Sequence, residues 1–128
     1  MPIASSPLVV WYNTHCPVCR IGIDRQRNRL VRAVNAGAIE FRNINLEPEA
    51  LAHLGIGVED VRRRLHGMDR AGRLHIGVDC AIEIWRRSPG EAWIARILES
   101  RLIHPLAQWA YDRFADQLYS WNRRRGHW

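Results

Sequence analysis

The chain has 128 residues, which suffices for one compact domain and is too short for two ordinary ones. Hydrophobic residues make up 47% of the sequence, so a core can form without disulfide bonds to support it. The net charge is +6, and the basic residues apart from histidine are all arginine. The absence of lysine excludes lysine Schiff-base chemistry and lysine-dependent phosphate-binding loops.

No targeting segment is visible in the sequence. Residues 1–12 lack a positively charged start, and the apolar stretch from Leu8 to Tyr12 is too short for the core of a secretory signal. No run approaches the ~20 apolar residues of a membrane-spanning helix. Three cysteines, an odd number, do not fit a secreted disulfide framework. We therefore expect a cytoplasmic protein with no membrane partner.

The first predicted elements are a strand, a helix and a second strand. Residues 8–13 are β-branched and aromatic, which is typical of a buried strand. Residues 17–36 predict a helix, because Pro17 suits the first helical position and Gly37 suits the end. Residues 38–44 alternate between apolar and polar side chains, as a second strand would.

The second half of the chain predicts short helices, a β-hairpin and three longer helices. Apolar and polar residues alternate on both sides of Asp69-Arg70-Ala71-Gly72, and a glycine-containing turn between such segments is typical of a hairpin. The Pro89-Gly90 pair separates the last two helices from the rest. The predicted segments are helices at 48–54 and 58–63, hairpin strands at 65–68 and 73–76, and helices at 78–87, 91–102 and 105–122.

The order strand–helix–strand–helix–strand–strand–helix is the thioredoxin-like order. The predicted fold class is therefore α/β, with a thioredoxin-like βαβαββα core and additional C-terminal helices. We expect a single domain over residues 1–128, in which residues 1–7 are a loose lead-in and residues 8–90 form the core. Residues 91–122 form the C-terminal helices, and residues 123–128 form a mobile basic tail.

Two cysteines lie directly after the first predicted strand, in the segment Cys16-Pro17-Val18-Cys19. At this spacing two residues share one helical face and are close enough for a disulfide. The first turn of a helix has unpaired N–H groups and a positive dipole end, and both stabilise a thiolate. A thiol in such a motif can have a pKa well below the ~8.5 of free cysteine. This pattern predicts thiol–disulfide exchange.

The depth of each cysteine in the predicted helix suggests its role. Cys16, at the helix end, is expected to be the exposed nucleophile, and Cys19, one turn inside, the resolving thiol. Protonated His15 is a candidate for stabilising the thiolate or steering an anionic partner, and an exposed loop histidine without a role is the alternative. Asn13 and Pro17 are further candidates for assisting residues. No cofactor is expected.

Two structural alternatives stand beside this interpretation. The cysteines could be buried and inert, or they could form half of a zinc site. A structural zinc site needs four cysteine or histidine ligands, and the sequence has no second pair. Cys80 would have to complete such a site with His53, His66 or His75. For Cys80 itself, a small buried hydrophobic residue is favoured over a third redox thiol.

These motifs together resemble the DCC family of predicted thiol–disulfide oxidoreductases. That family has an Asp-Gly-x-Cys-x-x-Cys motif after its first strand, which corresponds here to the segment from Asn13 to Cys19. Its later hairpin turn, helix start and aromatic C-terminal helix correspond to Asp69–Gly72, Gly77–Ala81 and Tyr111–Ala115, the last running to Arg123-Arg124. The resemblance spans most of the chain and implies redox activity.

The sequence departs from these patterns at two points. Asn13-Thr14 replaces the family's Asp-Gly pair, and an amide cannot transfer a proton as a carboxylate can. Thioredoxins also have a cis-proline facing the active site, and this chain has no proline between Pro48 and Pro89. Pro17 resembles the proline of the glutaredoxin-type pair. The partner implied is therefore a disulfide-containing protein or a small thiol such as glutathione.

Two other functions remain as hypotheses. Asn13-Thr14 would suit a redox-inactive binding module that kept the fold. The runs Arg62–Arg64, Arg86-Arg87 and Arg123–Arg125 would suit a basic adaptor for an anionic partner, although no nucleic-acid-binding motif supports one. Solvated surfaces also explain such runs. Most tryptophans on the predicted helices are expected in the core, with Trp109 and Trp121 as candidates for an exposed patch.

Overall fold

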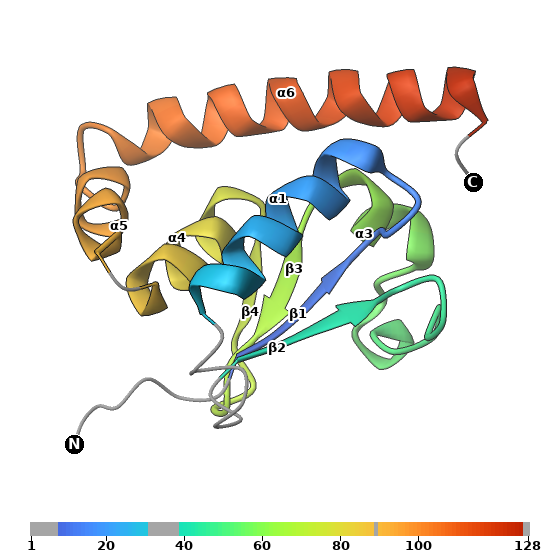
Figure 1. Cartoon of the computed structure of the whole chain (residues 1–128), viewed down its shortest axis with the longest axis horizontal. Helices are drawn as coiled ribbons and strands as arrows, with labels where there is room; N and C mark the ends of the chain where they lie inside the picture. Colours follow the sequence, from blue (N-terminus) through green and yellow to red (C-terminus); the bar gives the residue numbers. More distant parts are fainter. Residues whose placement is uncertain (1–7, 31–38, 89, 127–128) are drawn as a thin grey trace.

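The computed structural model describes residues 8–30, 39–88 and 90–126, and these residues form a mixed α/β fold around a four-stranded sheet (Figure 1). The strand order is β2-β1-β3-β4. The parallel pair is β1 and β2, whereas β3 is antiparallel to both of its neighbours. The strands are β1 (Leu8–Tyr12), β2 (Ile39–Asn43), β3 (His66–Met68) and β4 (Leu74–Ile76).

Helices cover both faces of this sheet, and a long C-terminal helix runs past one side of the molecule (Figure 1). This arrangement is the predicted thioredoxin-like core with additional C-terminal helices. No described helix combines the length and the apolar character needed to span a bilayer. The helices are α1 (Pro17–Arg29), the 3₁₀ turn η1 (Ala52–Leu54), α3 (Val58–Arg63), α4 (Val78–Arg87), α5 (Ala92–Leu98) and α6 (His104–Arg125).

Alternating side chains of β1 divide the core between the two faces of the sheet. Leu8 and Val10 pack with the end of α1 and with Cys80 and Ile84 of α4. Val9 and Trp11 point to the other face, where they pack with α3 and with the segment that follows β2. A third cluster joins α4, α5 and α6 around Val78, Ile82 and Ala95. Both α1 and α6 therefore belong to the α4 side of the molecule.

The hairpin turn has a direct local cause in Asp69. Its Oδ1 accepts a hydrogen bond from the Arg73 backbone N–H at 3.0 Å, and its Oδ2 lies 3.1 Å from Nε2 of His75. Gly72 has a φ of +82°, a conformation that glycine adopts without strain. The contact with His75 lowers the pKa of Asp69 to about 2. The carboxylate therefore stays charged at neutral pH and links the two sides of the hairpin through Arg73 and His75.

Most predicted elements are confirmed, and three segments differ. The predicted helix at 48–54 consists mainly of turns and ends in η1, because Gly55 has a left-handed φ of +76° that stops helical growth. The helix predicted at 91–102 is shorter and spans Ala92–Leu98. The helix predicted at 105–122 is longer and continues through Arg125.

The prediction that the tail begins at residue 123 is therefore wrong, because residues 123–125 belong to α6. Cationic side chains are favourable at the negative end of a helix dipole, and Arg123 also pairs with Glu59 of α3. Gly126, with a φ of +67°, ends the helix instead. The predicted lead-in at 1–7, the helix end at 31–37 and the last two residues lie outside the described residues.

Candidate active site

The two cysteines of the motif lie at the start of α1, where Cys16 caps the helix. Pro17 occupies the first helical position, as predicted, and Cys16 is the residue before it with an extended backbone. The Cys16 sulfur accepts a hydrogen bond from the Cys19 backbone N–H at 3.3 Å. Sulfur thus takes the place of the oxygen that usually caps a helix. Both cysteines are free thiols.

This position makes Cys16 far more acidic than an ordinary cysteine. The pKa of Cys16 is lowered to about 6, chiefly because the Cys19 side chain donates a hydrogen bond to its sulfur. Backbone N–H groups of Cys19 and Val18 and the side chain of Asn122 add to this effect, against the opposing effect of burial. At pH 7 a thiol with that pKa is about 90% ionised, whereas one with a pKa of 9 is about 1% ionised.

Cys19 has the opposite electrostatic character. Its pKa is raised above the ordinary range, because it is the donor to Cys16 and because burial and the neighbouring charge disfavour a second thiolate. One proton is therefore shared within the pair, with the charge on Cys16. The pattern matches what a nucleophile and a resolving thiol require.

The exposure of the two thiols is the reverse of the sequence prediction. Cys16 was expected at the surface and is 0% exposed, whereas Cys19 was expected inside and is partly exposed. The cause is α6, because its Asn122 hydrogen-bonds to Cys16 and is itself buried. The C-terminal helix therefore covers the end of α1 that the sequence suggested was open.

Asn122 is a residue of this site that sequence reasoning did not single out. It lies near the end of α6, far from the cysteines in sequence, and is 1% exposed. Its sequence signal is weak: it is an uncharged polar residue directly before the run Arg123–Arg125. A polar side chain this deeply buried requires a partner, and Cys16 is one.

The residues before Cys16 shape the turn that leads into α1. Asn13 is buried, and its Oδ1 accepts hydrogen bonds from the His15 backbone N–H at 3.0 Å and from Asn45 at 2.7 Å. The Cys16 N–H in turn donates to the Asn13 carbonyl at 3.3 Å. An asparagine supplies the acceptor oxygen that such a turn needs. His15 is exposed.

The segment just before β3, where thioredoxins have a cis-proline, contacts α6. The described residues contain no cis peptide bond. The backbone N–H of Leu65, just before β3, donates to the Tyr111 hydroxyl of α6 at 3.1 Å. The C-terminal helix thus binds a backbone N–H beside the end of the sheet that leads to the cysteine pair.

Cys80 lies apart from this pair in the core, as the simpler prediction had it. It is 0% exposed and packs against Leu8, Val10 and Ile84. Burial raises the pKa of its thiol to about 12, so it is protonated at neutral pH. A Cβ built on Gly67 would lie 3.0 Å from the Cys80 sulfur, which shows how closely the site is packed. These surroundings do not suit a third redox thiol.

The residues proposed for a zinc site do not come together. Within residues 8–30, 39–88 and 90–126, no three histidine, cysteine or acidic side chains are grouped so that they could hold a metal ion. His75 contacts Asp69, and Nδ1 of His66 lies 2.9 Å from the Arg64 carbonyl oxygen. These contacts belong to the hairpin and to the start of β3.

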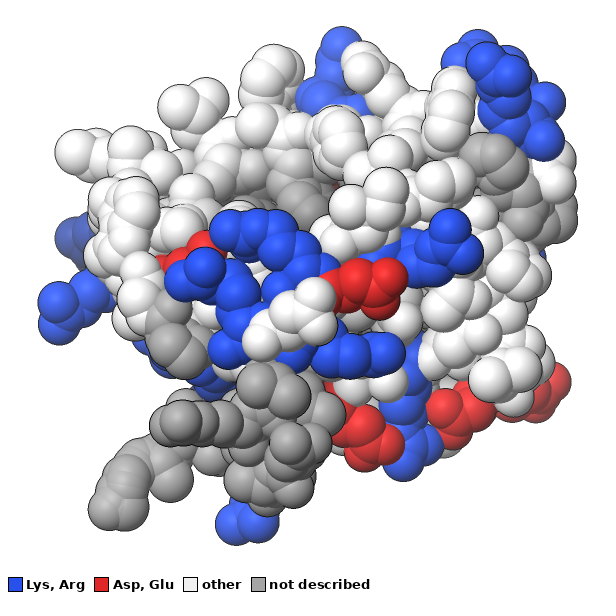
Figure 2. Space-filling view, in the orientation of Figure 1, with Lys and Arg blue, Asp and Glu red and all other residues white. Residues whose placement is uncertain are grey.

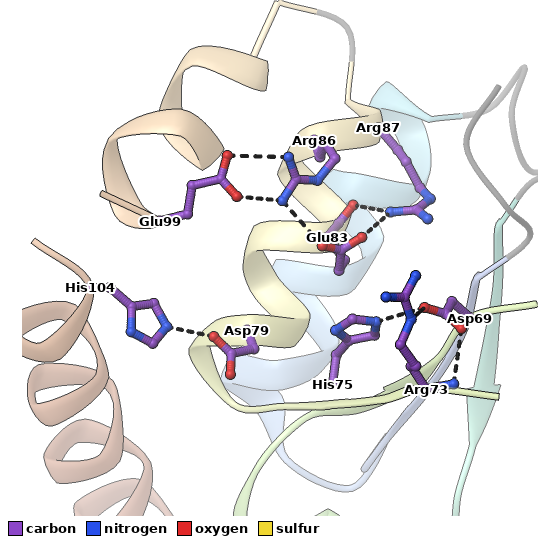
Figure 3. A network of polar contacts seen from close by, with 9 residues as sticks. All are labelled: Asp69, Arg73, His75, Asp79, Glu83, Arg86, Arg87, Glu99 and His104. Atoms are coloured by element: carbon purple, nitrogen blue, oxygen red, sulfur yellow. Dashed lines mark hydrogen bonds and ion pairs between the residues drawn. The ribbon is translucent and has the colours of Figure 1, made fainter. Parts of the chain in front are cut away.

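A polar network anchors the additional helices that carry Asn122 to the core (Figure 3). Arg86 of α4 binds Glu99 with an N–O distance of 2.6 Å, and Nε2 of His104, the first residue of α6, lies 2.6 Å from Asp79. Asp112 and Asp116, further along α6, pair with Arg64 at the end of α3. These contacts hold the start and the middle of α6 against the rest of the fold.

Close packing at Gly77 also positions α6. Gly77 has a φ of +66°, and a Cβ built on it would lie 3.2 Å from the Tyr111 ring. Any larger residue would strain the backbone and push Tyr111 away. Gly77 thus allows the end of the sheet and the middle of α6 to meet.

The arginines of the predicted runs are partly ion-paired, and the tryptophans of the helices differ in how exposed they are. Arg62 and Arg64 form ion pairs, which fits the interpretation of solvated, paired faces. Trp109 is 61% exposed, as the alternative of an exposed patch required, but Trp121 is only partly exposed. Trp93, expected in the core, is 60% exposed, and its indole N–H donates to the Gly90 carbonyl just before α5.

Comparison with known proteins gave one match. The family model described as DCC1-like thiol-disulfide oxidoreductase matches residues 10–124, a span that contains both cysteines, the hairpin and nearly all of α6. Neither the curated proteins nor the solved structures gave a match.

Proposed function

This chain belongs to the DCC1-like thiol-disulfide oxidoreductase family, and from that premise we propose that it exchanges disulfides through the Cys16–Cys19 dithiol. The observation that carries the proposal is the lowered pKa of Cys16, which is about 6 at the start of α1. A thiolate is the attacking species in exchange, and Cys16 is mostly ionised at neutral pH.

In the proposed reaction, the Cys16 thiolate attacks one sulfur of a substrate disulfide. A Cys16–substrate bond forms, the substrate disulfide breaks, and the first substrate thiolate leaves. Cys19 then gives up its proton and attacks the Cys16 sulfur. The second substrate thiol leaves, and the protein holds a Cys16–Cys19 disulfide. Two electrons have passed from the protein dithiol to the substrate, and an external thiol reductant must restore the dithiol.

The surroundings of the pair suit this division of roles. The Cys19 proton is held by its hydrogen bond to the Cys16 thiolate, so Cys19 does not compete for the first attack. Once Cys16 is bonded to substrate, its charge is gone, and the pKa of Cys19 falls because the like charge beside it has disappeared. The second step thus becomes available only after the first.

The stoichiometry of thiol release tests this proposal. Reduced protein mixed with excess 5,5′-dithiobis(2-nitrobenzoate) should release two equivalents of nitrothiobenzoate quickly, one in each step of the reaction. The third thiol, Cys80, should react only after unfolding, since it is packed in the core and burial raises its pKa to about 12, so that it stays protonated. If the folded protein releases thiol no faster than free cysteine and forms no internal disulfide, the chain is a binding module that kept only the fold.

A further inference from the structure

A cavity of about 350 Å³ lies beside the cysteine pair, between α1 and α6. Val18, Cys19 and Gly22 of α1 form one wall, and Phe114 and Leu118 of α6 are on the opposite side. Val18 and Phe114 are 44% and 55% exposed, so the cavity opens to solvent between the two helices. Its volume is at the lower end of the range for small-molecule sites.

Two lining residues carry polar atoms that have no partner in the described part of the chain. The first is Nδ2 of Asn13, a residue that is 1% exposed, and the second is Oε1 of Gln26. Oδ1 of Asn13 already accepts two hydrogen bonds, so the amide nitrogen is the free group. A buried donor without an acceptor is costly in free energy, and a ligand with an acceptor atom would remove that cost.

The charged side chains that line the cavity are basic, and three of them pair with carboxylates outside the lining: Arg25 with Glu91, Arg62 with Glu59, and Arg64 with Asp112 and Asp116. Four of the described lining residues are arginines and none is acidic; the arginines are Arg25, Arg62, Arg63 and Arg64. Figure 2 shows basic side chains gathered over the middle of the face on which α1 lies in Figure 1, with fewer acidic side chains among them. Most other lining residues are apolar, including Ile23, Val61, Ile84 and Trp85.

We propose that this cavity binds a small organic anion with an apolar body, and that this molecule is the thiol or disulfide that the dithiol exchanges. The apolar body lies between α1 and α6, and its acceptor group meets the Asn13 amide and the arginines. The inference rests on the proposed function, because Cys19, on the cavity wall, is hydrogen-bonded to the Cys16 sulfur. The exchange step is the two-electron reaction given above, with the anion's own disulfide as oxidant.

The geometry favours a small molecule over a folded protein. Cys16 is 0% exposed beneath α6 and does not line the cavity, so a substrate must approach its sulfur past Cys19, which a narrow molecule in the cavity does more readily than the rigid surface of a folded protein. The cavity, by contrast, leads to Cys19 from the open side between the helices.

Binding is tested without redox chemistry in a C16S/C19S variant of the full chain. The probe is 8-anilino-1-naphthalenesulfonate, an apolar anion whose fluorescence rises in apolar sites. Gly22→Leu fills the cavity, because nothing lies within 4 Å of a Cβ at Gly22. Ile21→Phe is the matched control, since Ile21 is 68% exposed on the same helix and does not line the cavity. Circular dichroism verifies that each variant is folded.

We expect one probe molecule per chain and a loss of affinity of about tenfold or more with Gly22→Leu, while Ile21→Phe retains the affinity. Asn13→Asp, which keeps the acceptor oxygen and removes the donor, should also weaken binding. Absence of saturable binding, or equal affinity in the Gly22→Leu variant, would overturn the proposal. Gly22→Ala should bind as the parent does, which separates cavity filling from the loss of glycine.

The exchange rate then tests the substrate class in the protein with both cysteines. Gly22→Leu should slow the reaction with 5,5′-dithiobis(2-nitrobenzoate), an aromatic carboxylate, by about tenfold, and leave the rate with cystamine, a small cation, within about twofold. Equal slowing of both disulfides would contradict the proposal, because it would mean that Cys16 itself was altered. Probe binding without reaction with either disulfide would refute the proposed function and leave the cavity as a binding site.

Discussion

Cys16→Ser should abolish disulfide exchange, whereas Cys19→Ser should stop it after the first step. Serine is not ionised near neutral pH, so loss of Cys16 should lower the rate by on the order of 10³-fold or more. With Cys19 replaced, Cys16 can still attack, but nothing within the protein displaces the bound thiol. Mass spectrometry should then find one substrate thiol bound to Cys16 as a stable mixed disulfide.

Cys80→Ser is the control for these two variants. Cys80 is a core residue with a pKa raised to about 12, so its replacement should leave the rate of exchange unchanged. It should cost some stability instead, because a hydroxyl would be buried among Leu8, Val10 and Ile84. A mixed disulfide on Cys19 in the Cys16→Ser variant, formed at the wild-type rate, would reverse the roles that we assign.

The pH dependence of thiol alkylation should show a midpoint near pH 6 for Cys16, about three units below an ordinary cysteine. Because the Cys19 thiol is the largest contributor to this shift, Cys19→Ala should raise the midpoint by at least about one unit, equivalent to about 1.4 kcal/mol. Cys19→Ser should raise it less, since a hydroxyl can still donate. The rate of iodoacetamide labelling, read for Cys16 by peptide mapping, measures these midpoints.

The same pKa shifts make the stability of the reduced protein depend on pH. Between about pH 6 and pH 9 the folded pair holds fewer protons than the unfolded chain, so the free energy of unfolding rises with pH. Above about pH 9 the unfolded chain loses both protons while folded Cys19 keeps its own, so stability falls. Urea unfolding relative to a C16A/C19A variant should therefore show a maximum near pH 9. A difference that does not change with pH would mean that Cys16 is an ordinary thiol.

Local sequence signals were sufficient for the core of the fold. Pro17 at a helix start, alternating residues around Asp69–Gly72 and the β-branched run of β1 each act through neighbours a few residues away. The structure places each of these where the local pattern predicts. The burial of Cys80 was expected on a different ground, because free cysteine is among the most buried residue types, and Cys80 of α4 is buried.

The covering of Cys16 could not be predicted, because it depends on the tertiary packing of α6. The position of Cys16 at the start of α1 indicated that it would be exposed. That position carries no information on α6, which covers this end of α1. Asn122, Tyr111 and Arg64 each contact groups that are far away in the sequence. The length of α6 was also underestimated, since its last turn is stabilised by arginines that resembled a solvated tail.

The claim that Cys16 and Cys19 form a redox couple is tested most directly by counting thiols at defined redox poise. The protein is equilibrated with mixtures of reduced and oxidised dithiothreitol, unfolded in excess alkylating agent and weighed by mass spectrometry. We predict a single two-electron transition from three labels to one, with the remaining label on Cys80. Three labels at every mixture, or a disulfide that includes Cys80, would contradict the account.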